Sequence, residues 1–487
     1  MRRNVLAALV CGVAISLSGF TRVSSEEATS DEYYELMKVF VDTFQQIDRN
    51  YVNDVDRKAL VEAAVKGMLD KLDPYSDYIS PQDLAKFTEA VEQEFGGVGI
   101  HVNFDQQQRN IEVMTTLPGG PAADAGIKAG DRIVEIEGKP VREFPDGQEI
   151  DQAIKVLKGE PGKSVKVTIK HLDKDETEEL TLTRAIIKLD TVLGDARKPD
   201  GAWNYWLDED KKIAYLRLTN FASRSGEEMR NVLQQLKQDG LKGLVLDLRF
   251  NPGGKLEAAV EIADLFLDAG LIVSTEGRNA LPQKFAAKKF GTFSGFPMAV
   301  LVNRYSASAS EIVSAALQDH HRAIVVGERS WGKGSVQTVI DMNVEGSKAA
   351  LKLTTAAYHR PSGKKIHRFP DAKETDEWGV MPDDGYKIEF TPQELTSYQR
   401  ARQQKDVVRP REPVEADFTD TQLAKAVEYV DRELTSPTKP EPAQAADKGP
   451  DGNGEASSND TTSRSNPRRT NRQERRGQLI VPPAPAT

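Results

Sequence analysis

Residues 298–327 read MAVLVNRYSASASEIVSAALQDHHRAIVVG, and this stretch decides the fold class. Its two apolar runs, 298–302 and 323–327, predict buried strands, and the segment 308–319 between them predicts a helix. Strands and helices that alternate at this spacing require crossover connections, so we predict an α/β unit on a largely parallel sheet. Further predicted elements of this unit are strands at 213–218, 243–249 and 349–358, helices near 225–238 and 256–267, and a short closing helix over 423–430.

Three serines, Ser306, Ser308 and Ser310, stand among small residues at the start of this helix. Ser308 opens the helix and has Glu311 three residues later, which is the pattern of a purely structural capping box. The same position places a hydroxyl beside free backbone N–H groups at the positive end of the helix dipole. It therefore also suits a nucleophile, whose reaction intermediate carries negative charge.

Two backbone donors are candidates for an oxyanion hole beside Ser308. The Ala309 amide lies in the first turn of the helix, where N–H groups have no partner within the helix. The second donor is Gly253 or Gly254, in the tight NPGG turn that follows the strand at 243–249. Small residues around Ser308 let the backbone of a substrate approach.

Lys333 lies between two glycines in the string WGKGSVQ at 331–337. An ordinary lysine, with a pKa of about 10.4, is protonated at neutral pH and cannot accept a serine proton. Burial in an apolar site lowers that pKa to roughly 7–8 and makes the amine a usable base. Gln337 is four residues further on and faces the same side, so it can orient the amine. Taken alone, a lysine of this kind is more often a solvated surface charge.

Residues 95–172 have a different pattern, with short strands and frequent glycines. The segment FGGVGIHV at 95–102 predicts a glycine-rich turn that enters a strand, and GDRIVEIEGKPV at 130–141 predicts strand, tight turn and strand. The other predicted elements are strands at 111–114 and 164–170 and helices at 121–127 and about 148–158. Together they make a compact half-barrel ahead of the α/β unit.

This half-barrel resembles a PDZ domain of the permuted bacterial type. The resemblance rests on Gly97, Val98, Gly99 and Ile100, followed by PAADAGIKAGDRIVEIEG. It implies that backbone N–H groups of this loop bind the C-terminal carboxylate of a peptide. The peptide would then add a strand to the edge of the sheet.

Over roughly residues 34–432 the chain is similar to the carboxy-terminal processing proteases, also called tail-specific proteases. The resemblance rests on the strings LRFNPGG at 248–254, SASASEI at 306–312, ALQD at 316–319 and WGKGSVQ at 331–337. It implies a serine endopeptidase with Ser308 as nucleophile, Lys333 as base and Gln337 as a third member. It also implies protein or peptide substrates with free C-termini, and no metal, nucleotide or other cofactor.

One departure from the family pattern lies at the end of the predicted PDZ helix. Where the family often has Leu-Arg-Gly, this chain has Leu157, Lys158 and Gly159. An arginine there can link the PDZ domain to the active site by bidentate pairing, which a lysine cannot do. The coupling between peptide binding and activation is therefore left open by the sequence.

The first 25 residues have the pattern of a secretory signal, with Arg2 and Arg3, an apolar run from Val5 to Ile15, and then small residues. We therefore expect an exported, periplasmic protein. An uncleaved N-terminus associated with the inner membrane is the alternative. Cys11 is the only cysteine and lies in this segment, so the exported chain would have no disulfide and no thiol chemistry.

The predicted organisation is a signal peptide at 1–25, an N-terminal helical region at 31–93, a PDZ domain at 95–172, a serine protease core at 173–435 and a tail at 436–487. Apolar residues at three- and four-residue steps in the helical region predict packing or dimerisation rather than chemistry. The Pro-, Ser- and Arg-rich tail has too few apolar residues to fold, so we predict disorder. We expect a homo-oligomer, and an adaptor protein is a further partner that the sequence allows.

Other functions fit the sequence less well. The net charge of −10 argues against nucleic acid as a partner. The string GERSWGKG at 327–334 approaches a phosphate-binding loop, but Gly334 stands where a metal-binding hydroxyl is required. A catalytically inactive PDZ protein that only binds peptides is the alternative that the residues do not refute.

A Ser–His–Asp hydrolase is a further alternative. His320 and His321 would lie roughly 18 Å from Ser308 along the helix, which is too far for a hydrogen bond. His359 and His367 are not excluded by their spacing.

Overall fold

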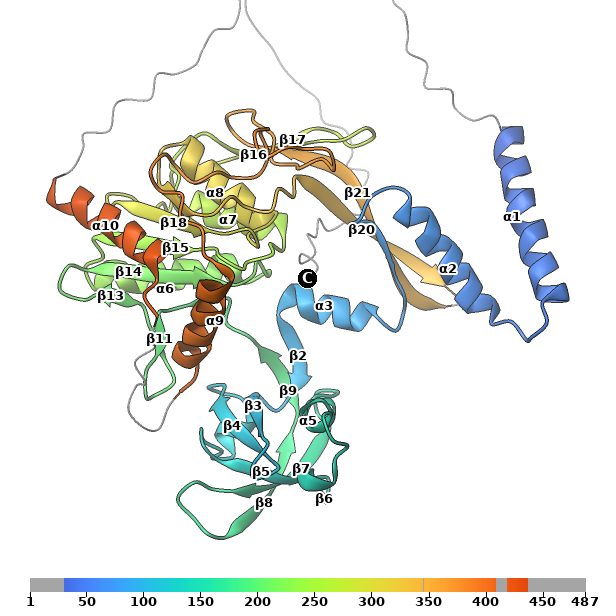
Figure 1. Cartoon of the computed structure of the whole chain (residues 1–487), viewed down its shortest axis with the longest axis horizontal. Helices are drawn as coiled ribbons and strands as arrows, with labels where there is room; N and C mark the ends of the chain where they lie inside the picture. Colours follow the sequence, from blue (N-terminus) through green and yellow to red (C-terminus); the bar gives the residue numbers. More distant parts are fainter. Residues whose placement is uncertain (1–29, 345, 409–417, 437–487) are drawn as a thin grey trace, which may run out of the picture. The chain divides into compact units, whose positions relative to one another are not determined.

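The computed structural model describes residues 30–344, 346–408 and 418–436 (Figure 1). The predicted signal segment and, apart from Ser436, the predicted tail lie outside the described residues. The structure divides into two units, residues 1–65 and 66–487. No helix in the part of the chain that the structure describes is long and apolar enough to cross a membrane.

The first unit contains helix α1 (Ser30–Asn50) and the start of α2 (Arg57–Asp70). The predicted apolar stripe is present on α1, where residues three or four apart share one face. Its side chains are exposed, including Tyr33, Leu36 and Phe40. Large apolar side chains that are exposed together on one helix face are typical of an interaction surface.

In the second unit, an antiparallel sheet with the strand order β3-β4-β5-β7-β8 confirms the predicted PDZ fold. Its elements are β3 (Ile100–Asp105), β4 (Asn110–Thr116), α4 (Pro121–Asp124), β5 (Arg132–Ile136), β6 (Lys139–Pro140), a 3-10 turn (Val141–Glu143), α5 (Glu149–Leu157), β7 (Ser164–Lys170) and β8 (Thr177–Thr183). Strand β8 extends the sheet beyond the strands that we predicted. Strand β3 lies at the other edge, beside α5.

Strands β2 (Glu94–Gly97) and β9 (Ala185–Lys188) pair antiparallel and connect the PDZ domain to the rest of the chain. Helix α3 (Leu84–Glu92) precedes β2. Short strands follow β9, namely β10 (Val192–Leu193), β11 (Ala196–Arg197), β12 (Trp203–Asn204) and β13 (Trp206–Asp208), and β11 pairs with β12. The PDZ domain is therefore an insertion carried on two antiparallel strands.

The protease core is built on a sheet with the order β10-β14-β15-β18-β19. Strands β14 (Ile213–Leu218), β15 (Gly243–Asp247), β18 (Met298–Val302) and β19 (Ile324–Gly327) are parallel. Strands β10 and β13 join β14 antiparallel. The predicted largely parallel sheet is confirmed, and its strands are nearly continuous apolar runs because helices cover both faces.

Helices α6 (Ser225–Gln238), α7 (Leu256–Asp264) and α8 (Ala309–Asp319) pack with one face of this sheet around a large apolar core. Helix α10 (Thr421–Thr435) packs on the other face (Figure 1), where Ala426 and Val430 contact buried strand residues. Helix α9 (Pro392–Asp406) precedes α10. The carboxyl ends of the parallel strands lead into the loops that form the candidate site.

A second, antiparallel sheet has the order β1-β21-β16-β17, with β20 also paired to β21. Its strands are β1 (Asp77–Ile79), β16 (Leu271–Glu276), β17 (Gln283–Ala286), β20 (Ser335–Val344) and β21 (Ser347–His359). Strand β1 lies in the helical region that we predicted at 31–93, and it pairs with residues 350–352 of β21. This pairing places the loop before β1 next to the protease core.

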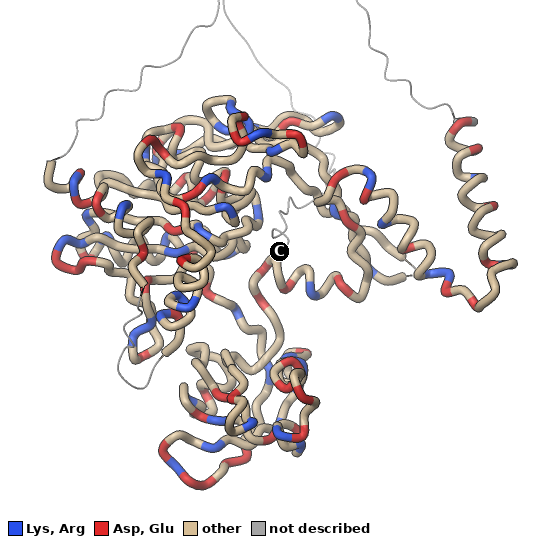
Figure 2. Tube along the Cα trace, viewed as in Figure 1, with Lys and Arg blue, Asp and Glu red and all other residues tan. Residues whose placement is uncertain are grey.

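Lys and Arg residues are interspersed with Asp and Glu residues along the described chain (Figure 2). Both signs of charge are therefore mixed along the part of the chain that the structure describes.

Candidate active site

Ser308 is the N-cap of α8 and adopts the unusual backbone angles φ 58° and ψ −107°. A serine rarely occupies this region, so the surrounding structure must impose the conformation. The residue is fully buried, and its hydroxyl makes no hydrogen bond to another residue that the structure describes. A strained turn that leaves the hydroxyl without a structural bond is compatible with a nucleophile, which needs a base within reach of that hydroxyl.

The structure distinguishes the three competing serines. Ser306 Oγ donates to Leu248 O at 2.8 Å, and Ser310 Oγ donates to Asn251 O at 2.9 Å. Both hydroxyls therefore tie α8 and its preceding loop to the residues that follow β15. Ser308 alone of the three has a hydroxyl with no such structural bond.

Glu311 connects the serine and the lysine. Its Oε2 atom accepts the backbone N–H of Ser308 at 2.7 Å and the backbone N–H of Lys333 at 2.8 Å. Its Oε1 atom accepts the Ser330 hydroxyl at 2.5 Å and the Gly332 N–H at 2.7 Å. Burial raises the pKa of this carboxyl, while the four donors act to lower it. The sequence predicted only the capping-box contact, so this wider role of Glu311 was missed.

Lys333 is 1% exposed, in a loop whose glycines permit close packing. A Cβ on Gly332 would lie 2.7 Å from Arg368 Cβ, and a Cβ on Gly334 would lie 2.4 Å from His367 N. Burial, assisted by the neighbouring Lys352, lowers the pKa of Lys333 to about 7. A pKa lowered to this range allows the amine to accept a proton at neutral pH, as the base hypothesis requires.

Gln337 is fully buried near the start of β20. Its amide nitrogen donates to Ser335 Oγ at 3.0 Å and to Thr354 Oγ1 at 3.1 Å. Its carbonyl oxygen has no hydrogen-bond partner within the described chain. An oriented, unused acceptor is compatible with the predicted role of holding an amine.

Tyr358 on β21 was not among the predicted site residues. Burial raises the pKa of its phenol, while the Ser308 hydroxyl acts to lower it, so the two hydroxyl groups face each other. The phenol oxygen has no aligned hydrogen bond to any described residue. Tyr358 therefore lines the site as a neutral hydroxyl.

The NPGG turn lies directly against the serine. A Cβ on Gly253 would lie 3.0 Å from Ser308 Cβ and 3.2 Å from the Ala309 nitrogen, so the site requires glycine here. The Gly253 N–H already donates to Asn251 Oδ1 at 2.9 Å. Of the predicted oxyanion donors, Gly254 and Ala309 are thus the two for which no such bond is seen.

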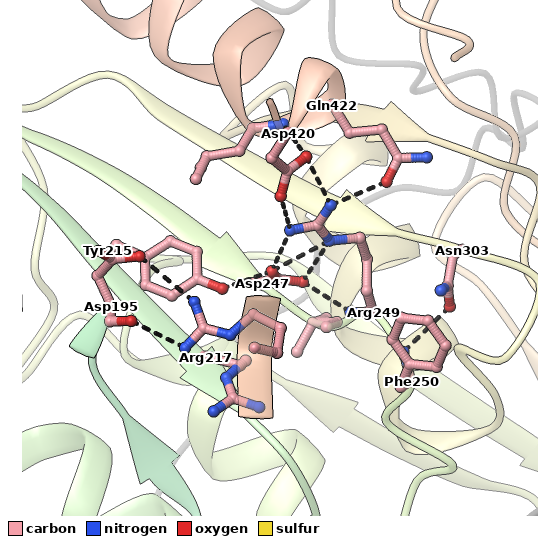
Figure 3. Close-up of polar contacts among 12 residues, drawn as sticks. Asp195, Tyr215, Arg217, Asp247, Arg249, Phe250, Asn303, Asp420 and Gln422 are labelled. Atoms are coloured by element: carbon pink, nitrogen blue, oxygen red, sulfur yellow. Dashed lines mark hydrogen bonds and ion pairs between the residues drawn. The ribbon is translucent and has the colours of Figure 1, made fainter. Parts of the chain in front are cut away.

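A buried ion cluster anchors this turn (Figure 3). Asp247 ends β15 and pairs with Arg249 at 2.7 Å, and Arg249 also contacts Asp420 at 2.8 Å and Gln422 at 2.9 Å. Burial acts to raise the pKa of Asp247, but Arg249 and the Tyr215 hydroxyl hold it below its ordinary value. Since Asp420 is the N-cap of α10, the cluster joins that helix to the residues just before the turn.

The predicted carboxylate-binding loop lies between β2 and β3. Val98 is buried, and its carbonyl accepts the Ala122 N–H at 3.0 Å. Gly99 has φ +76°, and a Cβ there would lie 3.2 Å from Ile187 Cδ1. Because β3 is an edge strand of its sheet, a peptide strand can be added beside it, as in other PDZ domains.

Lys158, which stands where the family often has arginine, contacts the strands that carry the PDZ domain. Its Nζ atom lies 4.2 Å from the centroid of the Phe95 ring and 4.0 Å from Glu89 Oε2. Glu89 belongs to α3. Lys158 is therefore tied to the connection between the PDZ domain and the core.

The histidines of the alternative Ser–His–Asp site make contacts elsewhere in the fold. His320 Nε2 contacts Leu271 O at 2.7 Å, and His359 Nε2 lies 3.8 Å from Glu276. His367 packs against Gly334, and burial lowers its pKa below the ordinary value. Among the described residues, no group of three or more His, Cys, Asp and Glu side chains has a metal-binding arrangement.

Three family models match the chain. They describe peptidase family S41 over residues 212–383, the PDZ domain over 112–171, and the N-terminal domain of the activating protease CtpB over 16–82. The carboxy-terminal-processing protease of Bartonella bacilliformis is 34% identical over 440 residues, which cover 88% of this chain and 95% of that protein. The carboxyl-terminal-processing protease of Picosynechococcus sp. is 34% identical over 336 residues, covering 69% and 74% respectively. The carboxy-terminal processing protease CtpA of Bacillus subtilis is 29% identical over 368 residues, covering 75% and 73%.

The fold, the inserted PDZ domain and these matches define a serine peptidase of the Ser/Lys type. The chain belongs to peptidase family S41 and is a C-terminal processing protease.

Proposed function

We propose that this chain is an exported endopeptidase in which Ser308 is the nucleophile and Lys333 the general base. The observation that carries the proposal is the shared Glu311 oxygen, which accepts the backbone N–H groups of both residues. This one carboxyl group thereby fixes the backbone of Ser308 relative to the backbone of Lys333. The lowered pKa of Lys333, about 7, supports its role as proton acceptor.

In the proposed reaction, Lys333 Nζ takes the proton of the Ser308 hydroxyl as Oγ attacks the scissile carbonyl. The backbone N–H groups of Ala309 and Gly254 donate to the developing oxyanion. The Lys333 ammonium then protonates the leaving amine, and an acyl-enzyme remains. Lys333 next takes a proton from the water that attacks the acyl group, and the Lys333 ammonium gives this proton to Ser308 Oγ as the bond between the acyl carbon and Oγ breaks. Gln337 orients the Lys333 amine through its free carbonyl oxygen.

Substrate selection is proposed to reside in the PDZ loop formed by Gly97, Val98, Gly99 and Ile100. The carboxylate of an apolar C-terminus binds the loop amides, and the preceding residues extend toward Ser308. The test uses two peptides of identical sequence, one with a free C-terminal carboxylate and one with a C-terminal amide. We expect the carboxylate peptide to have the higher kcat/KM by roughly tenfold, the value of one lost charge-assisted contact.

The matched control for that experiment is Gly99→Val, which adds a side chain at a left-handed position of the loop. In this variant the preference for the carboxylate should disappear while slow cleavage of both peptides continues. Equal cleavage of the two peptides by the unmodified enzyme would remove the PDZ loop from substrate selection.

The value of kcat/KM should rise with pH, because the catalytic base must be deprotonated. Below about pH 7 the Lys333 amine is protonated and cannot accept the serine proton, so kcat/KM should fall tenfold per pH unit there. Above that point the rate should level off. His367→Gln should keep the same midpoint, because His367 titrates below its ordinary value and is not the base. A midpoint that disappears in His367→Gln would assign the base to histidine instead.

Export and self-association complete the proposal. The arginine and apolar pattern of residues 1–25 supports export to the periplasm, which N-terminal sequencing of the protein from fractionated cells tests directly. The exposed apolar stripe on α1 supports a homo-oligomer. Leu36→Glu should reduce the mass of the assembly measured by light scattering, and an unchanged mass would place the contact elsewhere.

A further inference from the structure

The amine of Lys333 is covered by a residue from outside the protease core. Tyr75 lies in the loop between α2 and β1, and its ring centroid is 4.8 Å from Lys333 Nζ. The Trp331 indole N–H donates to the Tyr75 hydroxyl at 3.4 Å. We infer that Tyr75 is a positioning residue for the lysine base, because its ring shields the amine from water and holds it inside the site. This inference rests on the proposed role of Lys333.

The loop that carries Tyr75 is fixed by its own hydrogen bonds. Asp73 accepts the backbone N–H of Tyr75 at 2.8 Å and that of Ser76 at 2.9 Å, and it accepts the Ser76 hydroxyl at 2.8 Å. These are the contacts of an Asx turn, which defines the backbone path of a short loop. Tyr75 is therefore presented from a rigid support rather than from a mobile segment.

The same loop is joined to the lysine-bearing sheet. The Ser76 hydroxyl accepts the Thr354 N–H at 3.1 Å, and Thr354 Oγ1 accepts the Gln337 amide at 3.1 Å. Immediately after the loop, Asp77 pairs with Lys352 in the β1–β21 ladder. A continuous chain of contacts thus runs from Tyr75 to Gln337, the proposed partner of the Lys333 amine.

The Tyr75 ring acts on the amine in two opposing ways. By excluding water it favours the neutral amine, while its electron-rich face attracts the ammonium. The other ionisable groups that face Lys333 are Lys352 of β21, which lowers its pKa, and Glu311 of α8 and Asp73, which raise it. Burial is the largest of these influences, so we expect exclusion of water to outweigh attraction by the ring.

The test compares Tyr75→Phe, Tyr75→Leu and Tyr75→Ala in the full chain. Phenylalanine keeps the ring, so the midpoint of the kcat/KM profile should stay near pH 7. Alanine opens the site to water, so the midpoint should rise by about one pH unit or more, with about a fivefold loss of kcat at pH 7. KM should change little, and most of the lost activity should return at about pH 9. A merely structural defect would not be rescued by alkaline pH.

A second measurement follows the amine without turnover. In a Ser308→Ala background, the rate at which acetic anhydride modifies Lys333 is measured by mass spectrometry as a function of pH. The apparent pKa should rise for Tyr75→Ala and be unchanged for Tyr75→Phe. Leucine keeps the bulk but removes the ring face, so Tyr75→Leu should show an unchanged or lower apparent pKa.

The outcomes distinguish the shielding role of Tyr75 from the role of Lys333 as the base. Identical labelling profiles for Tyr75→Ala and Tyr75→Phe would overturn the shielding role of Tyr75, whatever the activity. If Tyr75→Ala does not fold, an apparent pKa that rises in Tyr75→Leu would overturn it as well. A labelling shift without a matching shift in kcat/KM would support shielding by Tyr75 but reject Lys333 as the base.

Discussion

Replacing Ser308 by alanine is expected to lower kcat/KM by roughly 10⁴-fold or more while the fold is retained. The loss follows from removal of the atom that forms the acyl-enzyme, which no neighbouring group can replace. The fold should survive because the Ser308 hydroxyl makes no hydrogen bond to another described residue. The measurement is hydrolysis of a peptide with a free C-terminus, together with the thermal unfolding midpoint of each variant.

Ser306→Ala and Ser310→Ala are the matched controls. Their hydroxyls bond to Leu248 O and Asn251 O, so each loss should cost roughly 1–3 kcal/mol of stability. Both variants should still turn over substrate, although they unfold at a lower temperature. The opposite pattern, with an active Ser308→Ala and an inactive Ser306→Ala or Ser310→Ala, would assign the nucleophile to another serine.

The sequence best predicted the strands that are buried on both faces of the sheet. Strands β14 and β18 are continuous apolar runs because both faces of the sheet are covered, and their bounds were predicted correctly. Strand β8 was missed because it lies at a sheet edge, and most of its residues are exposed. Helix α9 was missed because it is largely polar and buries few of its side chains.

The local geometry of the site could also be predicted in part. The helix start at Ser308 follows from a short sequence signal. The burial of Lys333 was expected only from its pairing with the serine motif, since a lone lysine is more often exposed. The role of Glu311 as a shared acceptor could not be predicted, because a capping-box glutamate has the same local pattern whether or not distant donors reach it. Those donors come from Ser330, Gly332 and Lys333, which only the tertiary fold brings to it.

The prediction of packing or dimerisation for residues 31–93 concerned their helices, and it did not address the loop that carries Tyr75. Tyr75 reaches Lys333 because strand β1 pairs with β21, and a three-residue strand leaves little periodicity in the sequence. Long-range pairing of this kind depends on the partner strand rather than on the segment itself. Local sequence patterns therefore do not predict which residues from distant segments contact this site.

Replacing Lys333 by methionine is expected to abolish hydrolysis and, at the same time, to stabilise the fold at low pH. Activity should fall by a factor comparable to that of Ser308→Ala. The two residues act as one catalytic unit, so the loss of either one removes most of the activity. Methionine has a similar length and no charge, so it suits a side chain that is 1% exposed. Binding of a C-terminal peptide to the PDZ domain should be unchanged, which separates catalysis from recognition.

The sign of the stability change follows from the two pKa values of the lysine. The pKa of Lys333 is about 7 in the folded chain and has its ordinary value, about 10.4, in the unfolded chain. Between these values the unfolded chain binds one more proton, so the stability of the parent protein should rise with pH across that window. The variant has no amine and should lack this slope. Below pH 7 it should be the more stable of the two, by at most on the order of 5 kcal/mol.

The comparison is made in a Ser308→Ala background, so that self-cleavage does not distort the unfolding curves. Thermal unfolding midpoints are recorded from about pH 6 to 10 for the parent, for Lys333→Met and for Lys348→Met, which changes an exposed lysine. The advantage of Lys333→Met should be largest at pH 6 and vanish near pH 10, while Lys348→Met should follow the parent throughout. Parallel curves for all three proteins would mean that the Lys333 amine titrates as an ordinary lysine, and an ordinary lysine is protonated at neutral pH and cannot take the proton from Ser308.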